Sequence, residues 1–250
     1  MTEEKTKQKS LTKNKTDSAH IISTQIINKG TGAGGKNTTL NGKKYEDQTD
    51  IESYLISKKF DKKIMDKKSP TGYYLYKEID NKKLYFTKQS GLKILMKKIF
   101  DIDIFRKPDE AFIIDDNSKI IIKILEKKVQ NTEGSVETKL WAGVALKREY
   151  EIVCEEKYTI NYAYSLSTFL SNKMKSSDNK YIVLKQILNE YNIKYFYGDD
   201  DNYINKIYDW FINDSEEIDE YNELYLFIKE YRKVKKNMSL KNFAKIYSDS

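Results

Sequence analysis

The sequence predicts an α/β fold in which helices flank a central mixed β-sheet. Two observations support this prediction. Segments with the two-residue periodicity of strands alternate along the chain with segments of helical periodicity, an order typical of a sheet covered by helices. In addition, five of the six residues in 120–125 (IIIKIL) are apolar, as expected of a strand buried at the centre of a sheet.

The 250 residues are enough to bury a full core as one domain. Residues 1–20 are polar throughout and predict a disordered basic arm. We expect residues 21–250 to form a single domain, because neither a repeat nor a linker interrupts them. Within it, residues 200–250 predict helices, which either complete the core or form an appendage for recognition or dimerisation.

After the arm, residues 21–27 predict a short strand or one helical turn, and a glycine-rich loop follows. Asn41-Gly42 is a turn signal. The next helix is therefore expected over 43–56, where apolar residues recur at helical spacing.

From residue 71 onward, strand and helix patterns alternate, with turn signals between them. The predicted strands are 71–79, 82–88, 110–114, 119–130, 159–167 and 193–198. The predicted helices are 90–100, 135–154, 180–192 and the segment after residue 200. Asp80-Asn81 and the run 115–118 mark the turns of two hairpins.

Histidine and cysteine contribute one residue each, His20 and Cys154. This count excludes disulfides within the chain and Cys/His zinc sites. A Cys-His or Ser-His pair would need His20, in the polar arm, as its base. Chemistry in this protein is therefore expected from carboxylates and lysines.

The chain carries a net charge of +7, with 45 Lys and Arg residues, mostly lysine, and 20 tyrosines. A positive, tyrosine-rich protein suits a phosphate backbone, although lysine also fills ordinary protein surface. The sequence has no run of 18 apolar residues that would span a membrane, and its N-terminus lacks the apolar stretch of a signal peptide. We therefore expect a cytoplasmic protein, with nucleic acid as a candidate partner.

One stretch combines acids and lysines at an informative spacing. Pro108-Asp109 opens the first strand of a predicted hairpin, and Glu126-Lys127-Lys128 ends the second. A hairpin pairs the start of one strand with the end of the next, so Asp109 is expected opposite Glu126. Side chains alternate along a strand, so Glu126 and Lys128 share one face, while Lys127 points away and should be dispensable for chemistry.

Two carboxylates and an ammonium on one sheet face suit phosphodiester hydrolysis. Asp109 and Glu126 offer the hard oxygen ligands that Mg²⁺ prefers, and the metal would keep waters for the attack. Lys128 would stabilise a hydroxide nucleophile and the charge of the transition state. The alternative is a hairpin facing solvent with an ordinary surface ion pair. The position at the end of the most apolar strand favours a functional role, because buried charge is costly.

Three linked motifs resemble those of one nuclease class. The segments "RKPDEAFI", "IKILEKKVQNTEGSVETKLWAG" and "GAGGKNTTLNGKKYED" are similar to motifs of type II restriction endonucleases of the PD-(D/E)xK superfamily. The match covers residues 29–52 and 105–145. It implies a restriction-endonuclease-like core and a Mg²⁺-dependent enzyme that cuts double-stranded DNA at a specific sequence, leaving 5′-phosphate and 3′-hydroxyl ends.

The resemblance also assigns roles to single residues. It makes Asp109 and Glu126 the metal ligands and Lys128 the catalytic lysine. Gln130 would contact the scissile phosphate or a metal-bound water, or would simply be a polar strand end. Glu46 would be an additional acid at the metal site, or a first-turn glutamate favoured by the helix dipole.

The glycine loop allows a second interpretation. Gly30-x4-Gly35-Lys36 nearly spells a nucleotide-binding P-loop, but Asn37 stands where that motif needs Ser or Thr, and the turn signal that follows argues against a helix directly behind the loop. We therefore expect this loop to contact DNA phosphates or base edges. Ser135, a good N-cap for the next helix, either helps to hold a phosphate or only caps that helix. The residues expected at the DNA are Gly34, Gly35, Lys36, Asn37, Thr38, Lys43 and Ser135.

Two other functions fit the same motifs. One is a repair or recombination nuclease that recognises DNA structure, and the other is a DNA-binding protein without catalysis. A restriction enzyme would be paired with a DNA methyltransferase that recognises the same site. It would work either as a monomer or as a homodimer.

Overall fold

The computed structural model of the protein describes residues 36–131, 138–155 and 157–213, and for residues 36–41 it describes the backbone alone. The chain divides into two compact units, Met1–Thr39 and Leu40–Ser250. Of the first unit, only residues 36–39 are described. The expectations for residues 1–35 and 214–250, including the basic arm, fall outside the described residues and stay predictions.

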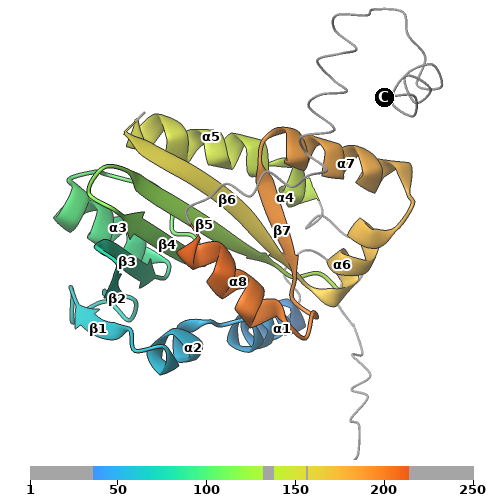
Figure 1. Ribbon diagram of the computed structural model, residues 1–250. Coiled ribbons are helices and arrows are strands. Elements are labelled where there is room, and N and C mark those ends of the chain that lie inside the picture. The colour runs from blue at the N-terminus through green and yellow to red at the C-terminus, as the bar shows by residue number, and fades with distance from the viewer. Residues whose placement is uncertain (1–35, 132–137, 156, 214–250) are drawn as a thin grey trace, which may run out of the picture. The chain divides into compact units, whose positions relative to one another are not determined.

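A seven-stranded sheet follows the chain order from β1 to β7 (Figure 1). Its strands are β1 (Asp61–Ile64), β2 (Tyr73–Ile79), β3 (Lys82–Thr87), β4 (Glu110–Asp115), β5 (Ile120–Lys128), β6 (Tyr158–Leu166) and β7 (Ile193–Tyr197). Neighbours from β1 to β5 are antiparallel, whereas β5, β6 and β7 are parallel. The sheet is therefore mixed, as the sequence predicts, because helical crossovers connect its last three strands.

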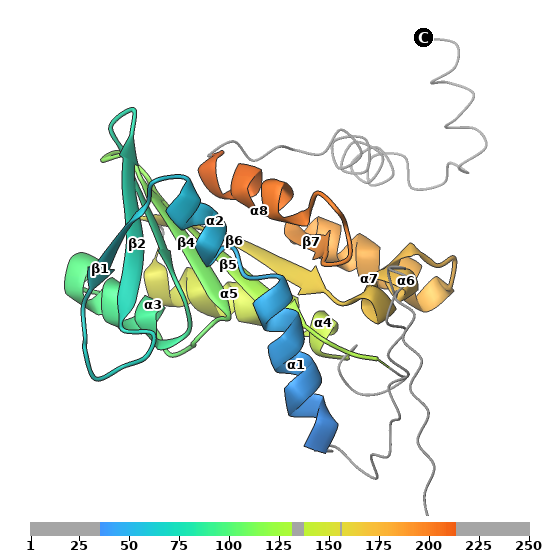
Figure 2. The ribbon, with the colours of Figure 1, turned by 90° about the horizontal axis from the view of Figure 1, so that it is seen from below.

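Helices cover both faces of the sheet (Figures 1 and 2). They are α1 (Lys36–Gln48), α2 (Glu52–Ser57), α3 (Ser90–Leu95), α4 (Thr138–Trp141), α5 (Gly143–Cys154), α6 (Thr168–Lys175), α7 (Asn179–Glu190) and α8 (Tyr203–Ile212), and α3 continues into a π-helical turn, η1 (Met96–Phe100). Residues of α3, α5, α6 and α7 pack on one face, and residues of α2 and α8 pack on the other. In the described ranges, none of these helices has the length and apolar character needed to cross a bilayer.

The central strand β5 contributes to a hydrophobic core on each side. Ile122 and Ile124 belong to the core beneath α5 and α7. Ile121 and Leu125 belong to the core beneath α2 and α8. All four are buried, which confirms the prediction of a strand covered on both faces.

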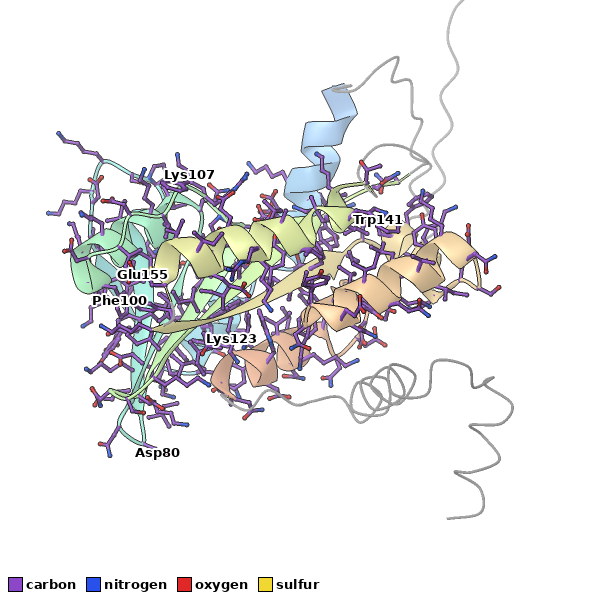
Figure 3. All side chains as sticks on the ribbon, turned by 90° about the horizontal axis from the view of Figure 1, so that it is seen from above. Asp80, Phe100, Lys107, Lys123, Trp141 and Glu155 are labelled. Carbon is purple, nitrogen blue, oxygen red and sulfur yellow. The ribbon has the colours of Figure 1, made fainter. Side chains whose placement is uncertain are left out.

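The β2–β3 hairpin forms where the sequence predicts it. Asp80 and Asn81 adopt φ values of 50° and 65°, the left-handed conformation that a tight hairpin turn requires at both central positions. Figure 3 shows Asp80 at the tip of this hairpin. Asp and Asn tolerate this conformation better than other residues with side chains.

The predicted turn at Asn41-Gly42 is wrong, because both residues lie inside α1. Good helix formers on the C-terminal side of this pair, Lys43, Lys44 and Glu46, outweigh the weak local signal. The helix also begins at Lys36, directly behind the glycine loop. One of the two sequence arguments against a P-loop therefore fails, and the argument from Asn37 remains.

The helix predicted over 43–56 is in fact split between α1 and α2. Asp50 interrupts the helical path, and its Oδ1 accepts the backbone N–H of Glu52 at 2.8 Å. Such a local bond competes with continued helix formation. Ile51 beside it is fully buried, so core packing stabilises the bend.

The helix predicted over 135–154 is interrupted before Gly143. Tyr164 of β6 lies at this break, and its hydroxyl is 3.1 Å and 3.4 Å from the carbonyl oxygens of Lys139 and Leu140, to which it donates. Gly143 permits the close approach, since a Cβ at that position would lie 2.6 Å from Tyr164 Oη.

The sequence prediction lacks two short elements, β1 and α6. All four residues of β1 are exposed, so this edge strand shows no alternation between apolar and polar residues. The eight residues of α6 form barely two turns and include several polar side chains. Both elements owe their structure to neighbours in space.

Two helical glycines should respond in opposite ways to alanine. Gly143→Ala places a methyl group against buried Tyr164 and should lower the free energy of unfolding by about 1–3 kcal/mol. At Gly42 a Cβ would meet nothing within 4 Å. Gly42→Ala should therefore raise the free energy of unfolding by about 0.5–1 kcal/mol. Urea unfolding followed by circular dichroism measures both changes. Equal effects would show that the close packing at Gly143 is absent.

Candidate active site where β4 begins and β5 ends

The β4–β5 pairing brings the two predicted metal ligands together. The ladder ends with Glu110 opposite Leu125, so Asp109 stands opposite Glu126 one step further on. The Asp109 Oδ2 atom accepts the backbone N–H of Lys127 at 2.6 Å. This bond holds the Asp109 carboxylate against β5, and the predicted register is confirmed.

Glu126 and Lys128 form an ion pair at the end of β5. Lys128 Nζ lies 2.6 Å from Glu126 Oε2, and the two side chains are only 15% and 20% exposed, respectively. Burial raises the pKa of Glu126 above its usual value, and the Asp109 carboxylate adds to this rise, although Lys128 opposes it. The pair is thus less solvent-exposed than an ordinary surface pair. Additional positive charge nearby would favour the ionised form of Glu126.

Aromatic and basic groups border this pair. Glu126 lies beside Tyr164 in the β5–β6 register, and Lys128 Nζ is 5.8 Å from the centre of that ring. Arg106 is held by Glu149 of α5 through bonds of 2.9 Å and 2.8 Å, and its charge opposes the rise in the pKa of Glu126. Two cations, Lys128 and Arg106, therefore act on Glu126.

A third predicted acid, Glu46, comes from α1. The residue as a whole is exposed, but neighbouring atoms partly desolvate its carboxyl group. This desolvation raises the pKa of Glu46, and the nearby Asp109 carboxylate raises it further. The structure thus brings Glu46 within electrostatic reach of Asp109, although the two residues lie far apart in the sequence.

A buried hydroxyl network fixes α1 to the sheet. Ser165 Oγ of β6 lies 2.8 Å from Tyr45 Oη of α1 and accepts a second bond, also 2.8 Å long, from Tyr203 of α8. Burial raises the pKa of both tyrosines above the usual value, so their hydroxyls stay protonated at neutral pH. Three distant segments therefore meet at a single serine.

The opposite face of β5 carries a second ion pair. Lys127 Nζ lies 2.7 Å from Glu110 Oε1, and their side chains are 4% and 1% exposed. Lys127 therefore points away from Lys128, as strand alternation predicts. It is not a spare surface lysine, because its removal would leave Glu110 buried without a counter-charge.

Another lysine of β5 is also buried, Lys123. It is 1% exposed, and its Nζ donates to the carbonyl oxygens of Trp210 and Asn213, both at 2.5 Å. Figure 3 labels Lys123 between the strands and α8. The burial of Lys123 and Lys127 was not predicted from the sequence. The available signal is lysine within an otherwise apolar strand, which implies a specific buried partner.

Gln130 lies beyond the end of β5, which stops at Lys128. Its backbone N–H donates to Ser167 Oγ at 3.1 Å, and its carbonyl oxygen accepts from the same hydroxyl at 2.9 Å. The strand predicted over 119–130 therefore ends two residues early, because the hydroxyl of Ser167, which follows β6, binds the backbone of Gln130.

The residues predicted to contact DNA are described only in part. Three of them lie outside the described residues: Gly34, Gly35 and Ser135. Three others form the first turn of α1 instead of a loop, which corrects their predicted placement: Lys36, Asn37 and Thr38. Lys43 is exposed on α1, where it is available to a ligand.

Asp109 and Glu126 form a donor set that fits magnesium. Within the described ranges, no group of three or more Asp, Glu, His or Cys side chains is arranged to hold a metal ion. Mg²⁺ is commonly bound through one or two carboxylates, with water and substrate phosphate completing its shell. Two carboxylates at adjacent strand ends fit this pattern.

Comparison with known proteins gives no match to a family model, a curated protein or a solved structure.

Replacing two adjacent lysines should distinguish the two faces of β5. Lys127→Met should lower the free energy of unfolding by about 3–5 kcal/mol, because Glu110 keeps an unpaired buried charge. Lys128→Met should cost at most about 1 kcal/mol, because both members of its pair reach solvent. Guanidinium unfolding of the two variants at neutral pH gives the comparison. Equal losses would contradict the difference in burial between the two ion pairs.

Proposed function

We propose that this protein is a Mg²⁺-dependent, sequence-specific endonuclease that hydrolyses phosphodiester bonds in double-stranded DNA, in the manner of a type II restriction enzyme. The observation that carries the proposal is the convergence of Asp109, Glu126 and Lys128 at one end of the sheet. These are the residues whose spacing resembles the PD-(D/E)xK motif. The sequence resemblance and the spatial arrangement therefore support the same set of residues.

Each of the three side chains has its own task in this proposal. Asp109 and Glu126 would hold Mg²⁺, which when bound supplies an acidified water and positive charge for the phosphate oxygens. Lys128 would stabilise the negative charge of the nucleophile and of the transition state. Its ion pair with Glu126 orients the ammonium before substrate arrives, so little reorganisation is needed.

Positive charge beside the acids supports a nucleic acid substrate. The whole chain carries a net charge of +7. Arg106 and Lys107 directly precede the Pro108-Asp109 pair and are exposed, and Lys43 is exposed on the helix that carries Glu46. Such side chains can neutralise phosphates on both sides of a scissile bond.

One assay separates this function from its two alternatives. Plasmid DNA incubated with protein and Mg²⁺ should give discrete fragments, and omission of Mg²⁺ should leave the plasmid intact. A smear would favour a nuclease that recognises DNA structure. Retarded but uncut DNA would favour a DNA-binding protein without catalysis. Methylation by a methyltransferase of the same specificity should protect the plasmid from cutting.

Loss of any of the three site residues should stop cleavage while preserving binding. Asp109→Ala, Glu126→Ala and Lys128→Ala should each slow single-turnover cleavage by about a thousandfold or more, because each removes charge stabilisation specific to the reaction. Glu78→Gln, on the exposed surface of β2, is the matched control and should cut normally. Cleavage rates and cognate-DNA affinity are measured together. Appreciable cleavage by Asp109→Ala would rule out this assignment.

The first half of α1 should bind DNA and should not bind a nucleotide. Lys36→Ala and Lys43→Ala should weaken binding to any duplex and reduce the salt slope by about one each, if each lysine neutralises one phosphate. Asn37→Ala should cost roughly 1–3 kcal/mol at the cognate site only, as expected for a base contact. Salt titrations on cognate and random duplexes separate these outcomes. ATP should be neither hydrolysed nor required, and measurable ATP hydrolysis would revive the P-loop interpretation.

A further inference from the structure

Lys127 contacts three parts of the molecule at once. Its Nζ lies 2.7 Å from Glu110 Oε1, and it also donates to the carbonyl oxygens of Glu46 and Thr49, at 3.3 Å and 3.2 Å. Its backbone N–H meanwhile donates to Asp109 Oδ2 at 2.6 Å. One residue therefore binds β4, the end of α1 and a proposed metal ligand.

The contacts with α1 follow from the electrostatics of a helix end. α1 ends at Gln48, so the carbonyl oxygens of Glu46 and Thr49 belong to its last turn and its exit. Carbonyl groups at a helix C-terminus lack helical partners and carry partial negative charge, which favours a cation. The Lys127 ammonium supplies that cation from inside the protein.

This arrangement links Glu46 to Asp109 through a single residue. Lys127 holds the backbone of Glu46 with its side chain and the carboxylate of Asp109 with its own backbone. The relative position of the two acids therefore depends on the Lys127 ammonium staying at the helix end.

Stability alone does not account for the buried pair. Replacing a buried ion pair by apolar residues of similar volume is often neutral or stabilising. Glu110 Oε2 is buried and has no hydrogen-bond partner among the described residues, so its polar atoms are incompletely satisfied. A lysine can bind the carbonyl oxygens at the end of α1, and an apolar side chain cannot.

We infer that Lys127 is a positioning residue for the proposed nuclease. It fixes the end of α1 from the sheet face that carries Glu110, opposite to the face of Glu126 and Lys128, and so places Glu46 relative to Asp109. The inference rests on the proposed function for its catalytic consequence, and it revises the expectation from strand alternation that Lys127 is dispensable for chemistry. The anchoring of α1 is a separate physical claim and can be measured without any cleavage.

A double-mutant cycle tests the catalytic consequence. The variant Lys127→Met/Glu110→Leu removes both charges and should fold, because neither member is left unpaired. With Glu46 present it should cut about tenfold more slowly than the parent, and in the Glu46→Gln background it should slow cleavage by less than about twofold. A similar loss in both backgrounds would overturn the inference and leave Lys127 as a stabilising residue only.

Lys123→Met is the matched control, because Lys123 lies on the same strand and binds carbonyl oxygens at the end of α8 instead of α1. Any loss of rate that it causes should be the same with Glu46 or Gln at position 46. If the apolar pair does not fold, Lys127→Met/Glu110→Gln replaces it in the cycle, because this pair is neutral and Met at position 127 has no donor for the carbonyl oxygens of α1.

Hydrogen exchange tests the anchoring and separates it from the proposed function. In either paired variant, amides of residues 42–48 should exchange at least about tenfold faster than in the parent, while those of β4 and β5 keep their protection. Unchanged exchange in α1 would overturn the inference even in an active enzyme. If the parent protein cuts no DNA, the proposed function fails, and faster exchange in α1 would still support the anchoring by Lys127.

Discussion

Antiparallel pairing of β4 with β5, with Glu110 opposite Leu125, determines where each charged group of the candidate site lies. A shift of one residue would carry Lys127 onto the site face and turn the proposed catalytic residues toward the core beneath α2 and α8. The turn between the strands opposes such a shift. There, Asp116 Oδ1 accepts the backbone N–H of Lys119 at 2.6 Å, which favours one loop length and hence one register.

The same strand end holds two ion pairs in different environments. Lys128 and Glu126 keep contact with solvent, so a cation or a phosphate can reach them. Lys127 and Glu110 are enclosed beneath α1, where their charges can act only on the protein. Alternation along β5 thus places the two pairs on opposite faces. The Lys128–Glu126 pair is suited to chemistry, and the Lys127–Glu110 pair is suited to holding α1, the helix that carries Glu46.

Local patterns were enough to predict much of this arrangement. A strand period of two places Glu126 and Lys128 on one face, and hairpin geometry places Asp109 opposite Glu126, so this part of the site follows from spacing alone. The Asp80-Asn81 turn likewise depends on the conformational preference of its own residues. A feature can be predicted from the sequence when the residues that cause it all lie within one short segment.

Contacts between distant segments decided the rest. The bend after α1 depends on the burial of Ile51, and the break before Gly143 depends on a tyrosine from β6. The role of Lys127 depends on carbonyl oxygens some 80 residues earlier. Sequence patterns were sufficient to predict the mixed sheet, the hairpin register and the shared strand face of Glu126 and Lys128. Which lysines are buried and where α1 lies could be seen only in the folded protein, because neighbours in space set burial and helix placement, and local periodicity does not encode those neighbours.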